Sequence, residues 1–390
     1  MSEQKPKKES SDADAAQRWD DCDLEAQYFG DHLRQSRQER KQLSAKDRSK
    51  YKKTDSEKRD KRAKEAFNPE DLKRKGYSRG RVTSILSQGI VVHAEGRDHL
   101  CELRGVLKKE RTRQKNICVV GDFVWFEELG RSEGIIQAVE PRETVLMRAD
   151  NLSRHLQHLL AANIHQVLIT SSVVRPLLKP SLIDRYIIAT RRGGMTPVIL
   201  INKIDLLQTS DDEIVGEQQQ LLEDVLNAYE PSGIRVLPVS STTGEGLDKL
   251  RRQMEGTSSV FSGQSGTGKT SLINAMLDLD LPTGKTVQKT RKGAHTTTSA
   301  NLLPLVGGGW CVDTPGIKSF GVWDLQPDDV EAYFNEIHAT GHGCKFSDCS
   351  HTHEEDCAVK AAIEEGEIST LRYDSYVALR EESITGSRPR

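Results

Sequence analysis

Long apolar runs are missing from this 390-residue sequence, and no stretch approaches the roughly 18 apolar residues that a membrane span requires. Residues 1–21 also lack the apolar segment of a secretory signal, and their many acids argue against an organellar transit peptide. These absences exclude a transmembrane protein. We expect a cytoplasmic protein with no membrane partner, and the length predicts two to four domains.

Core-forming side chains are scarce in the first 75 residues. Residues 33–65 carry 14 basic and six acidic side chains and contain no Val, Ile or Phe. The formal net charge of -2 for the whole chain conceals this basic segment, because the remainder of the chain is acidic. Such a composition predicts disorder, or a solvated helix that orders only on a partner. The sequence leaves open whether this extension contacts RNA or is merely solvated.

Five short apolar runs separated by turn residues follow between residues 80 and 140. They read GRVTSIL, GIVVHA, HLCELRGVL, VVGDFVWFE and GIIQAVE. Five strands in so short a segment predict a small β-barrel. An OB-type barrel is one candidate, because its exposed strand face and loops suit oligonucleotides. A structural β-module of no special function explains the pattern equally well.

From about residue 160 to 325, apolar strands alternate with helices. We expect strands at 166–172, 197–202, 235–240, 259–263, 301–306 and 310–313, and helices at 181–192, 211–229, 246–254 and 269–277. This alternation predicts a mostly parallel sheet covered on both faces, with ligands at the carboxyl ends of its strands. Beyond residue 325 the sequence becomes helical and polar around a Cys/His cluster.

The string GQSGTGKT at 263–270 fits the phosphate-loop pattern between an expected strand and an expected helix. Its glycines let backbone N–H groups close round phosphates, Lys269 reaches the β and γ oxygens, and the Thr270 hydroxyl ligates Mg²⁺. We assign nucleotide binding to this loop and the residue after it. Those residues are Gly263, Gln264, Ser265, Gly266, Thr267, Gly268, Lys269, Thr270 and Ser271.

A guanine pocket is indicated by NKID at 202–205, where a strand is expected to end. Asp205 can accept hydrogen bonds from the two N–H donors on the guanine edge, whereas adenine presents the opposite pattern. Asn202 can bridge the base and the phosphate loop, and the Lys203 stem can lie along the ring. We include Ile204 in this motif. After the next strand, Ser240 and Ser241 would lie near the guanine carbonyl oxygen.

Two further strings predict nucleotide-sensing segments. In DTPG at 313–316, Asp313 can hold the Mg²⁺ shell through water, and the Gly316 N–H can contact the γ-phosphate. In GAHTTTS at 293–299, one of three threonines would ligate Mg²⁺ as the first switch. We take Thr297 as that ligand, although the sequence does not decide among residues 296–298.

The order of these motifs is unusual. A conventional GTPase runs from phosphate loop to switch threonine, DxxG, NKxD and serine loop, whereas here NKID and the serine loop come first. This order predicts a circularly permuted domain. With the preceding barrel and the following Cys/His cluster, the chain resembles the RsgA (YjeQ) family of small ribosomal subunit biogenesis GTPases. The resemblance spans about residues 77–385 and includes CELRGVL, VVGDFVW, KGAHTTT, DTPGIKSFG and LRYDSYVAL.

The water-orienting glutamine of Ras-like enzymes is absent, because Ile317 follows DTPG. The catalytic group must therefore come from elsewhere, and His295 in the first switch is our candidate. The family resemblance points to the same residue through the G-x-H-T-T-T motif. This sequence has Ala294 where the family commonly has arginine, a departure that leaves the histidine in place.

The cysteines indicate metal ligation in a reducing compartment rather than a disulfide framework. Three thiols and one imidazole follow the spacing C-x4-C-x-H-x5-C at Cys344, Cys349, His351 and Cys357. Four N/S ligands with no open position predict a structural zinc ion. The neighbouring His338, His342 and His353 are competing ligands by sequence alone, and the resemblance favours His351.

Together these patterns predict a multidomain protein with an N-terminal OB-type β-barrel, a central α/β circularly permuted P-loop GTPase domain and a C-terminal, mainly helical zinc-binding domain. The expected segments are a charged extension at 1–75, the barrel at 77–141, the GTPase domain at 145–325 and the zinc domain at 326–390. The resemblance implies a monomeric GTPase that uses Mg²⁺ with GTP, binds the small ribosomal subunit and its rRNA, and assists late maturation. An alternative is a GTP-regulated RNA-binding adaptor whose hydrolysis is incidental.

Overall fold

The computed structural model describes residues 67–104, 117–149, 157–209, 213–277, 300–313 and 326–385. The first described element is a short helix, α4 (Pro69–Arg74), at the end of the segment in which we expected no stable structure. Asn68 caps this helix by accepting hydrogen bonds from the backbone N–H groups of Glu70 and Asp71 at 3.2 and 3.4 Å. A proline in the first turn also favours the helix start. Local capping therefore orders the end of an otherwise polar segment.

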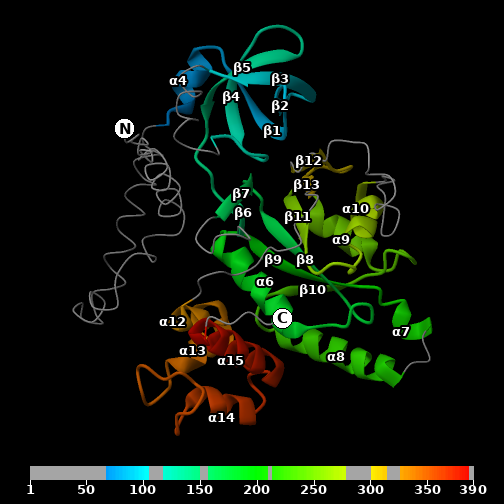
Figure 1. Cartoon of the computed structure of the whole chain (residues 1–390), viewed down its shortest axis with the longest axis vertical. Helices are drawn as coiled ribbons and strands as arrows, with labels where there is room; N and C mark the ends of the chain where they lie inside the picture. Colours follow the sequence, from blue (N-terminus) through cyan, green and yellow to red (C-terminus); the bar gives the residue numbers. More distant parts are fainter. Residues whose placement is uncertain are drawn as a thin grey trace, which may run out of the picture.

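The five strands that follow close into a barrel, which confirms the predicted architecture (Figure 1). They are β1 (Ser78–Leu86), β2 (Gly89–Ala94), β3 (Arg97–Leu103), β4 (Phe123–Glu128) and β5 (Glu133–Val139). The strand order is β1-β2-β3-β5-β4, and a β1–β4 pairing closes the ring. Alternate residues of β2 point inward, so Ile90, Val92 and Ala94 help to form the barrel core.

The central sheet is mostly parallel, as its alternating pattern predicted. Its strands are β8 (Gln166–Ser172), β9 (Thr196–Asn202), β10 (Arg235–Pro238), β11 (Ser258–Ser262), β12 (Asn301–Pro304) and β13 (Trp310–Asp313). They lie in the order β10-β9-β8-β11-β13-β12, and β12 alone runs antiparallel to its neighbour in this set. β12 ends earlier than expected, because Leu305 and Gly309 begin to form the turn into β13.

Helices cover both faces of this sheet. They are α6 (Pro180–Arg192), α7 (Leu206–Thr209), α8 (Glu213–Tyr229), α9 (Leu247–Met254) and α10 (Lys269–Leu277). Alternate residues of β8 enter two separate cores: Val167 and Ile169 pack in the core that α6 and α8 share, and Leu168 packs in the core beneath α9 and α10. Burial on both faces explains why the central strands read as continuous apolar runs.

A two-stranded hairpin joins the barrel to the central sheet and was missed by sequence reasoning. It consists of β6 (Val145–Ala149) and β7 (Gln157–Ala162), paired antiparallel. The Val145 N–H donates to the Gly193 carbonyl at 3.1 Å, beyond the end of α6. The hairpin strands are short and mixed in polarity, so their pairing depends on this tertiary support.

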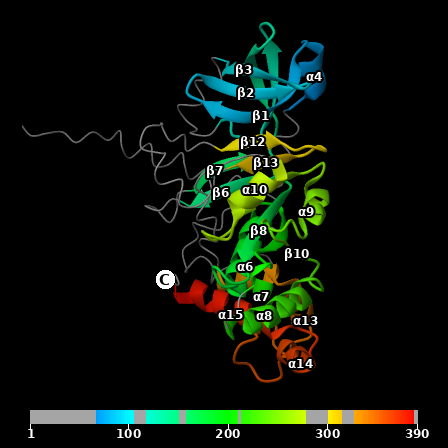
Figure 2. The same ribbon diagram turned by 90° about the vertical axis from the view of Figure 1, so that its right-hand side faces the viewer.

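The barrel also pairs directly with the central sheet. Ser84 of β1 lies opposite Asn301 of β12, so strands from both units form one continuous sheet of 11 strands within the described chain. Figure 2 shows β1 lying next to β12 at this junction, with β13 on the far side of β12. The barrel therefore sits at one end of an elongated molecule, fixed to the strands that lead to the nucleotide motifs.

Short helices form the opposite end of the molecule. They are α12 (Pro327–Val330), the 3₁₀ helix η2 (Glu331–Tyr333), α13 (Asn335–Gly341), α14 (Ala358–Glu364) and α15 (Thr370–Thr385). Their core includes Phe334, Ile337 and Tyr376, together with Ile188 contributed by α6 of the central unit. The helical segment is therefore docked on α6 rather than separate from it.

A buried arginine anchors this docking. Arg372 of α15 forms ion pairs with Asp184 of α6 and with Glu336, the latter at 2.6 Å, and its guanidinium lies over the rings of Tyr229 and Phe334. Burial opposes the charge on Arg372, but the carboxylates of Asp184 and Glu336 outweigh it and raise the pKa of the guanidinium above its usual value. We call these five residues the Arg372 cluster.

We predict that Arg372→Met lowers the free energy of unfolding by about 3–5 kcal/mol, because it leaves the Asp184 carboxylate buried without its partner. Arg185→Met is the matched control, since Arg185 pairs with Glu382 in a more exposed place on the same interface. Its loss should cost about 1 kcal/mol or less. Urea unfolding of both variants tests this, and equal losses would show that the Arg372 cluster does not anchor the helical segment.

Candidate functional site

The phosphate loop connects the end of β11 to the start of α10, as its motif predicted. A Cβ atom on Gly263 would lie 2.1 Å from the Thr170 carbonyl oxygen, and one on Gly268 would lie 2.3 Å from Asn202 Nδ2. Both glycines also have positive φ angles, 145° and 91°. No other residue type fits these two positions without displacing the Thr170 backbone or the Asn202 side chain.

Lys269 braces this loop from within. Its Nζ donates to the carbonyl oxygens of Gly263 and Gln264 at 2.8 and 2.7 Å, and the Thr267 hydroxyl donates to the Gln264 carbonyl at 3.0 Å. Thr267 is buried, whereas the solvent side of the loop carries Ser265, Gly266 and Thr270, with Ser271 half-buried behind them. The loop is thus held in shape before any phosphate arrives.

Asn202, at the end of β9, connects the guanine motif to the phosphate loop. Its Nδ2 donates to the Thr267 carbonyl at 2.8 Å, and its Oδ1 accepts from the Ser241 N–H at 3.2 Å. The side chain is fully buried, so both bonds are shielded from water. One amide therefore holds the NKID, serine and phosphate loops together.

The lysine of the same motif spans the phosphate loop. Lys203 has a φ of 66°, and its Nζ donates to the Gly266 carbonyl at 2.6 Å and to the Arg175 carbonyl. Partial burial, together with the nearby Arg175 guanidinium, lowers the pKa of Lys203. Its stem therefore crosses the space between NKID and the phosphate loop, beside the half-buried Ile204.

Asp205 is oriented by the serine loop. The buried Ser240 hydroxyl donates to Asp205 Oδ1 at 2.6 Å and accepts from the Thr242 and Thr243 N–H groups at 3.2 and 3.1 Å. Ser240 thus holds the carboxylate in place while serving as the cap of its own turn. An oriented carboxylate is the acceptor that a guanine edge requires.

The remaining residues predicted to bind the nucleotide lie at the end of a described range or outside the described residues. Asp313 ends β13, which pairs parallel with β11, so its backbone lies at the sheet edge from which the phosphate loop starts. His295, Thr297 and Gly316 lie outside the described residues. Their assigned roles stay predictions.

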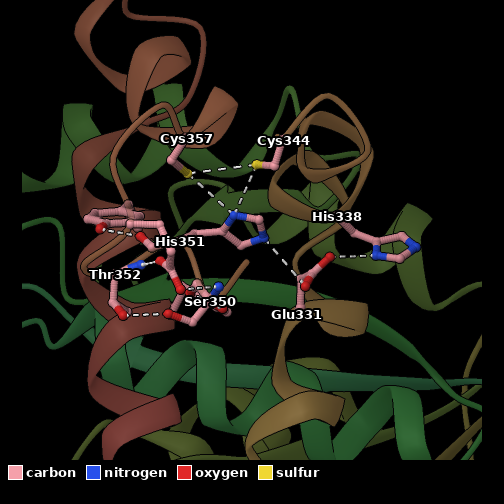
Figure 3. Close-up of polar contacts among 10 residues, drawn as sticks. Glu331, His338, Cys344, Ser350, His351, Thr352 and Cys357 are labelled. Atoms are coloured by element: carbon pink, nitrogen blue, oxygen red, sulfur yellow. Dashed lines mark hydrogen bonds and ion pairs between the residues drawn. The ribbon is translucent and has the colours of Figure 1, made fainter. Parts of the chain in front are cut away.

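The four expected metal ligands lie together near the C-terminus. The Sγ atoms of Cys344, Cys349 and Cys357 and the imidazole of His351 all lie within 4.8 Å of one another. Figure 3 shows three of these ligands, Cys344, His351 and Cys357. His351 Nδ1 is 3.5 Å from both Cys344 Sγ and Cys357 Sγ, and those two sulfurs are 3.8 Å apart. A tetrahedral ion with bonds of about 2.3 Å to sulfur and about 2.0 Å to nitrogen requires ligand spacings of about 3.5–3.8 Å. The donor set therefore fits zinc.

The competing histidines are directed elsewhere. His338 Nδ1 is 2.9 Å from Glu331, the His342 ring packs on His338, and the His353 side chain is 82% exposed. Among the described residues, His351 is the histidine grouped with the cysteines. The structure thus resolves a choice that spacing alone left open.

Surrounding side chains orient the ligand loop. Tyr373 and Tyr376 of α15 donate to the carbonyls of His351 and Ser350 at 2.7 and 2.9 Å. The Glu354 carboxylate accepts from the Ser350 and Thr352 N–H groups; although burial opposes ionisation, these hydrogen bonds lower its pKa below the usual value. The loop is therefore bonded to α15, the helix that carries Arg372.

Two parts of the chain that lie beside these sites had no recognisable motif in the sequence. The segment 172–178 lies beside the phosphate loop, where the Arg175 carbonyl accepts from Lys203, and the Pro176 ring would lie 3.7 Å from a Cβ on Gly266. Glu331 lies 3.5 Å from His351 Nε2, on the side of the ring away from the sulfurs (Figure 3). A backbone carbonyl and a distant acid leave no motif, so only the fold identifies them.

The permuted motif order on a parallel sheet, with the NKID, serine and phosphate loops joined by Asn202, defines a circularly permuted P-loop GTPase. The profile of the family described as RsgA GTPase matches residues 139–323. The chain belongs to the RsgA family, and its enzymatic class is GTP hydrolase.

Named relatives and solved structures support this membership. The protein named small ribosomal subunit biogenesis GTPase RsgA 1 of Vibrio vulnificus is 39% identical over 263 residues, which cover 66% of this chain and 72% of the relative. The Haemophilus influenzae protein named small ribosomal subunit biogenesis GTPase RsgA is 37% identical over 305 residues, 77% of this chain and 83% of the relative.

The fold is similar to two crystal structures. YjeQ from Thermotoga maritima has a TM-score of 0.63 and 31% identity, covering 80% of this chain and all of that one. YloQ, described as a circularly permuted GTPase, has a TM-score of 0.62 and 26% identity, covering 80% of this chain and 97% of that one. In the ranges that the structure covers, no helix has both the length and the apolar character needed to cross a bilayer.

Proposed function

We propose that this protein is a GTPase that binds the small ribosomal subunit through its rRNA and assists late maturation, hydrolysing GTP with subunit-stimulated turnover. The observation that carries the nucleotide part is the Asn202 amide, which joins the guanine, serine and phosphate loops in one site. The ribosomal part is supported by the names of the relatives.

Each predicted residue then has a defined task. Asp205, oriented by Ser240, accepts from the guanine edge, and Lys203 covers the base. The phosphate loop and Lys269 bind the β and γ phosphates through N–H donors, because charge-assisted bonds to phosphate are the strong ones. Bound Mg²⁺ would be held by Thr270, Thr297 and, through water, Asp313, and would neutralise phosphate charge. Gly316 would respond to the presence of the γ-phosphate.

His295 is proposed as the catalytic residue. The segment that contains it precedes β12, and β12 pairs with both β1 of the barrel and β13. A ribosomal subunit bound at the barrel would therefore act on β1, the strand paired with β12, and β12 directly follows the segment that contains His295. We propose that subunit binding there places the imidazole of His295 against the attacking water, in the role of the missing glutamine.

We predict that His295→Ala lowers subunit-stimulated GTP turnover by about 10²-fold while GTP affinity stays within twofold, since a positioned acid–base group contributes on that order. The measurement is GTP hydrolysis with and without purified small subunits. His342→Ala, an exposed histidine outside the site, is the control and should keep the parent rate. Equal stimulated rates in His295→Ala and parent would remove His295 from the mechanism.

The Cys/His cluster is proposed to hold one structural zinc ion and to report nucleotide state. The second switch begins at Asp313, and the helical segment begins at α12, so a short connection links them along the chain. We propose that GTP and GDP favour different orientations of the helical segment on the ribosome. The alternative function, an RNA-binding adaptor with incidental hydrolysis, requires that small subunits leave the hydrolysis rate unchanged.

A further inference from the structure

A pocket of about 330 Å³ lies where the barrel meets the central sheet, away from the GTP site. Its walls combine arginine, aromatic and neutral polar side chains: Arg79, Arg81 and Phe123 from the barrel, and His165, Ser258 and Trp310 from the central unit. We call it the junction pocket. Its volume falls at the lower end of the range for ligand-binding sites.

Arg81 places a buried guanidinium in the wall of the junction pocket. Its side chain is only 7% exposed, and it donates to Ser258 Oγ and the Asn163 carbonyl, both at 2.7 Å. Its Nε is buried and has no hydrogen-bond partner among the described residues, and no described carboxylate forms an ion pair with it. Burial, with the charge of Arg79, lowers the pKa of Arg81 to about 10. A buried cation held by neutral groups alone retains an unmet attraction for an anion.

Arg79 provides an internal comparison. It lies two residues away on the same strand and forms a two-pronged ion pair with Glu140, at 2.7 and 2.9 Å. The charge of Arg79 is therefore matched by a carboxylate, whereas no carboxylate in the described part of the chain pairs with Arg81. The one acid that lines the described pocket wall, Glu95, is exposed in the turn after β2.

His165 adds a second donor to the pocket. Its Nδ1 accepts from the Ser258 N–H at 3.0 Å, so the neutral ring carries its proton on Nε2. The residue is exposed and lines the pocket, which leaves the Nε2–H free to donate. Arg81 and His165 thus present positive and N–H character to one space.

The aromatic wall supplies stacking surfaces. The Arg81 guanidinium lies 5.1 Å from the Phe123 ring centroid and 5.6 Å from that of Trp310, and the His93 ring meets Trp310 edge-on at 5.3 Å. Both Phe123 and Trp310 are half-buried. Aromatic rings and guanidinium planes are the groups on which unpaired bases stack, and basic side chains neutralise the adjoining phosphate.

We propose that the junction pocket binds one nucleotide unit, with its phosphate on Arg81 and His165 and its base against Trp310 and Phe123. The site goes beyond the proposed GTP chemistry, because the pocket lies at the opposite strand ends from it. Ser258 begins β11 and Trp310 begins β13, whereas these strands end at the phosphate loop and at Asp313. A free mononucleotide and a single-stranded RNA segment present the same chemistry, so the test separates them.

The experiment uses the full chain saturated with GDP and Mg²⁺, so that the guanine site is filled. The probes are a fluorescein-labelled uridine octaribonucleotide, followed by anisotropy, and uridine monophosphate, followed by tryptophan fluorescence. Arg81→Met should weaken binding at least tenfold and reduce the salt slope for the octamer by about 0.7, the value for one phosphate contact on a single strand. Arg131→Met, an exposed arginine in the β4–β5 turn, is the matched control and should change affinity less than twofold.

Trp310→Phe provides an independent measurement that does not depend on the folding of Arg81→Met. Phenylalanine keeps a stacking surface, so binding should persist while the ligand-induced quenching of tryptophan fluorescence disappears. Arg81-dependent binding of both probes identifies a mononucleotide site, and binding of the octamer alone identifies an RNA site. Binding that is insensitive to Arg81→Met, or quenching that persists in Trp310→Phe, would overturn the proposal.

Discussion

Asp205→Asn is expected to lower affinity for GTP by about 10²–10⁴-fold and to create affinity for xanthosine triphosphate. In the proposed site the carboxylate would accept two hydrogen bonds from the guanine edge, and hydrogen bonds to a charged group contribute about 1.5–3 kcal/mol each. An asparagine offers one acceptor and one donor group, which clash with guanine but match the carbonyl and N–H of xanthine. The preference should therefore reverse rather than merely decline.

The local structure should survive this change. Ser240 Oγ donates to Asp205 Oδ1 at 2.6 Å, and an asparagine carbonyl can accept the same bond. Competition binding of GTP and xanthosine triphosphate measures the effect. Asp248→Asn, the same substitution at an exposed residue of α9, is the control and should leave both affinities unchanged. An Asp205→Asn protein that still prefers GTP would show that this carboxylate does not read the base.

Cys349→Ser is expected to reduce bound zinc from about one ion per chain to below about 0.1 and to unfold the helical end of the molecule. Structural zinc sites contribute on the order of 10–16 kcal/mol, comparable with the total stability of a domain. The ligand loop has few apolar residues of its own, and the hydrogen bonds from Tyr373 and Tyr376 reach its backbone carbonyls. Removing the ion should therefore release the loop and weaken the docking of α15.

Zinc content by mass spectrometry and hydrogen exchange over residues 326–385 test this expectation. Cys118→Ser is the matched control, because Cys118 is also a half-buried free cysteine but lies in the barrel region. It should keep the zinc and the protection of the helical segment. Full zinc occupancy in Cys349→Ser, or equal loss of zinc in both variants, would contradict the assignment.

Much of the site was accessible from sequence because its residues act where strands end. A phosphate loop needs glycine where the backbone is crowded, and Gly263 and Gly268 occupy such places against Thr170 and Asn202. NKID likewise begins at Asn202, the last residue of β9. These requirements are local, so they leave strings that can be recognised without knowledge of the fold.

Features that join distant segments could not be predicted in this way. The Arg372 cluster brings together residues of four helices, α6, α8, α13 and α15, and Asp184 and Arg372 are 188 positions apart in the chain. No periodicity marks such a pair, because a single arginine on a polar helix is normally exposed. The β6–β7 hairpin and the pairing of β1 with β12 depend in the same way on partners supplied by folding.

By itself, the sequence determined the permuted order of the GTPase motifs, the alternation that makes the sheet parallel, and the four residues suited to zinc. Each of these depends on residue type and spacing along the chain. The tertiary structure alone decided that the barrel and the sheet are continuous, that α15 is anchored on α6, and that Arg81 is buried with no described carboxylate paired to it. These features arise from residues that are far apart in the sequence and meet only in the folded chain. For Arg372 and Arg81, the free energy of the charge depends on burial and on the partners that the fold supplies.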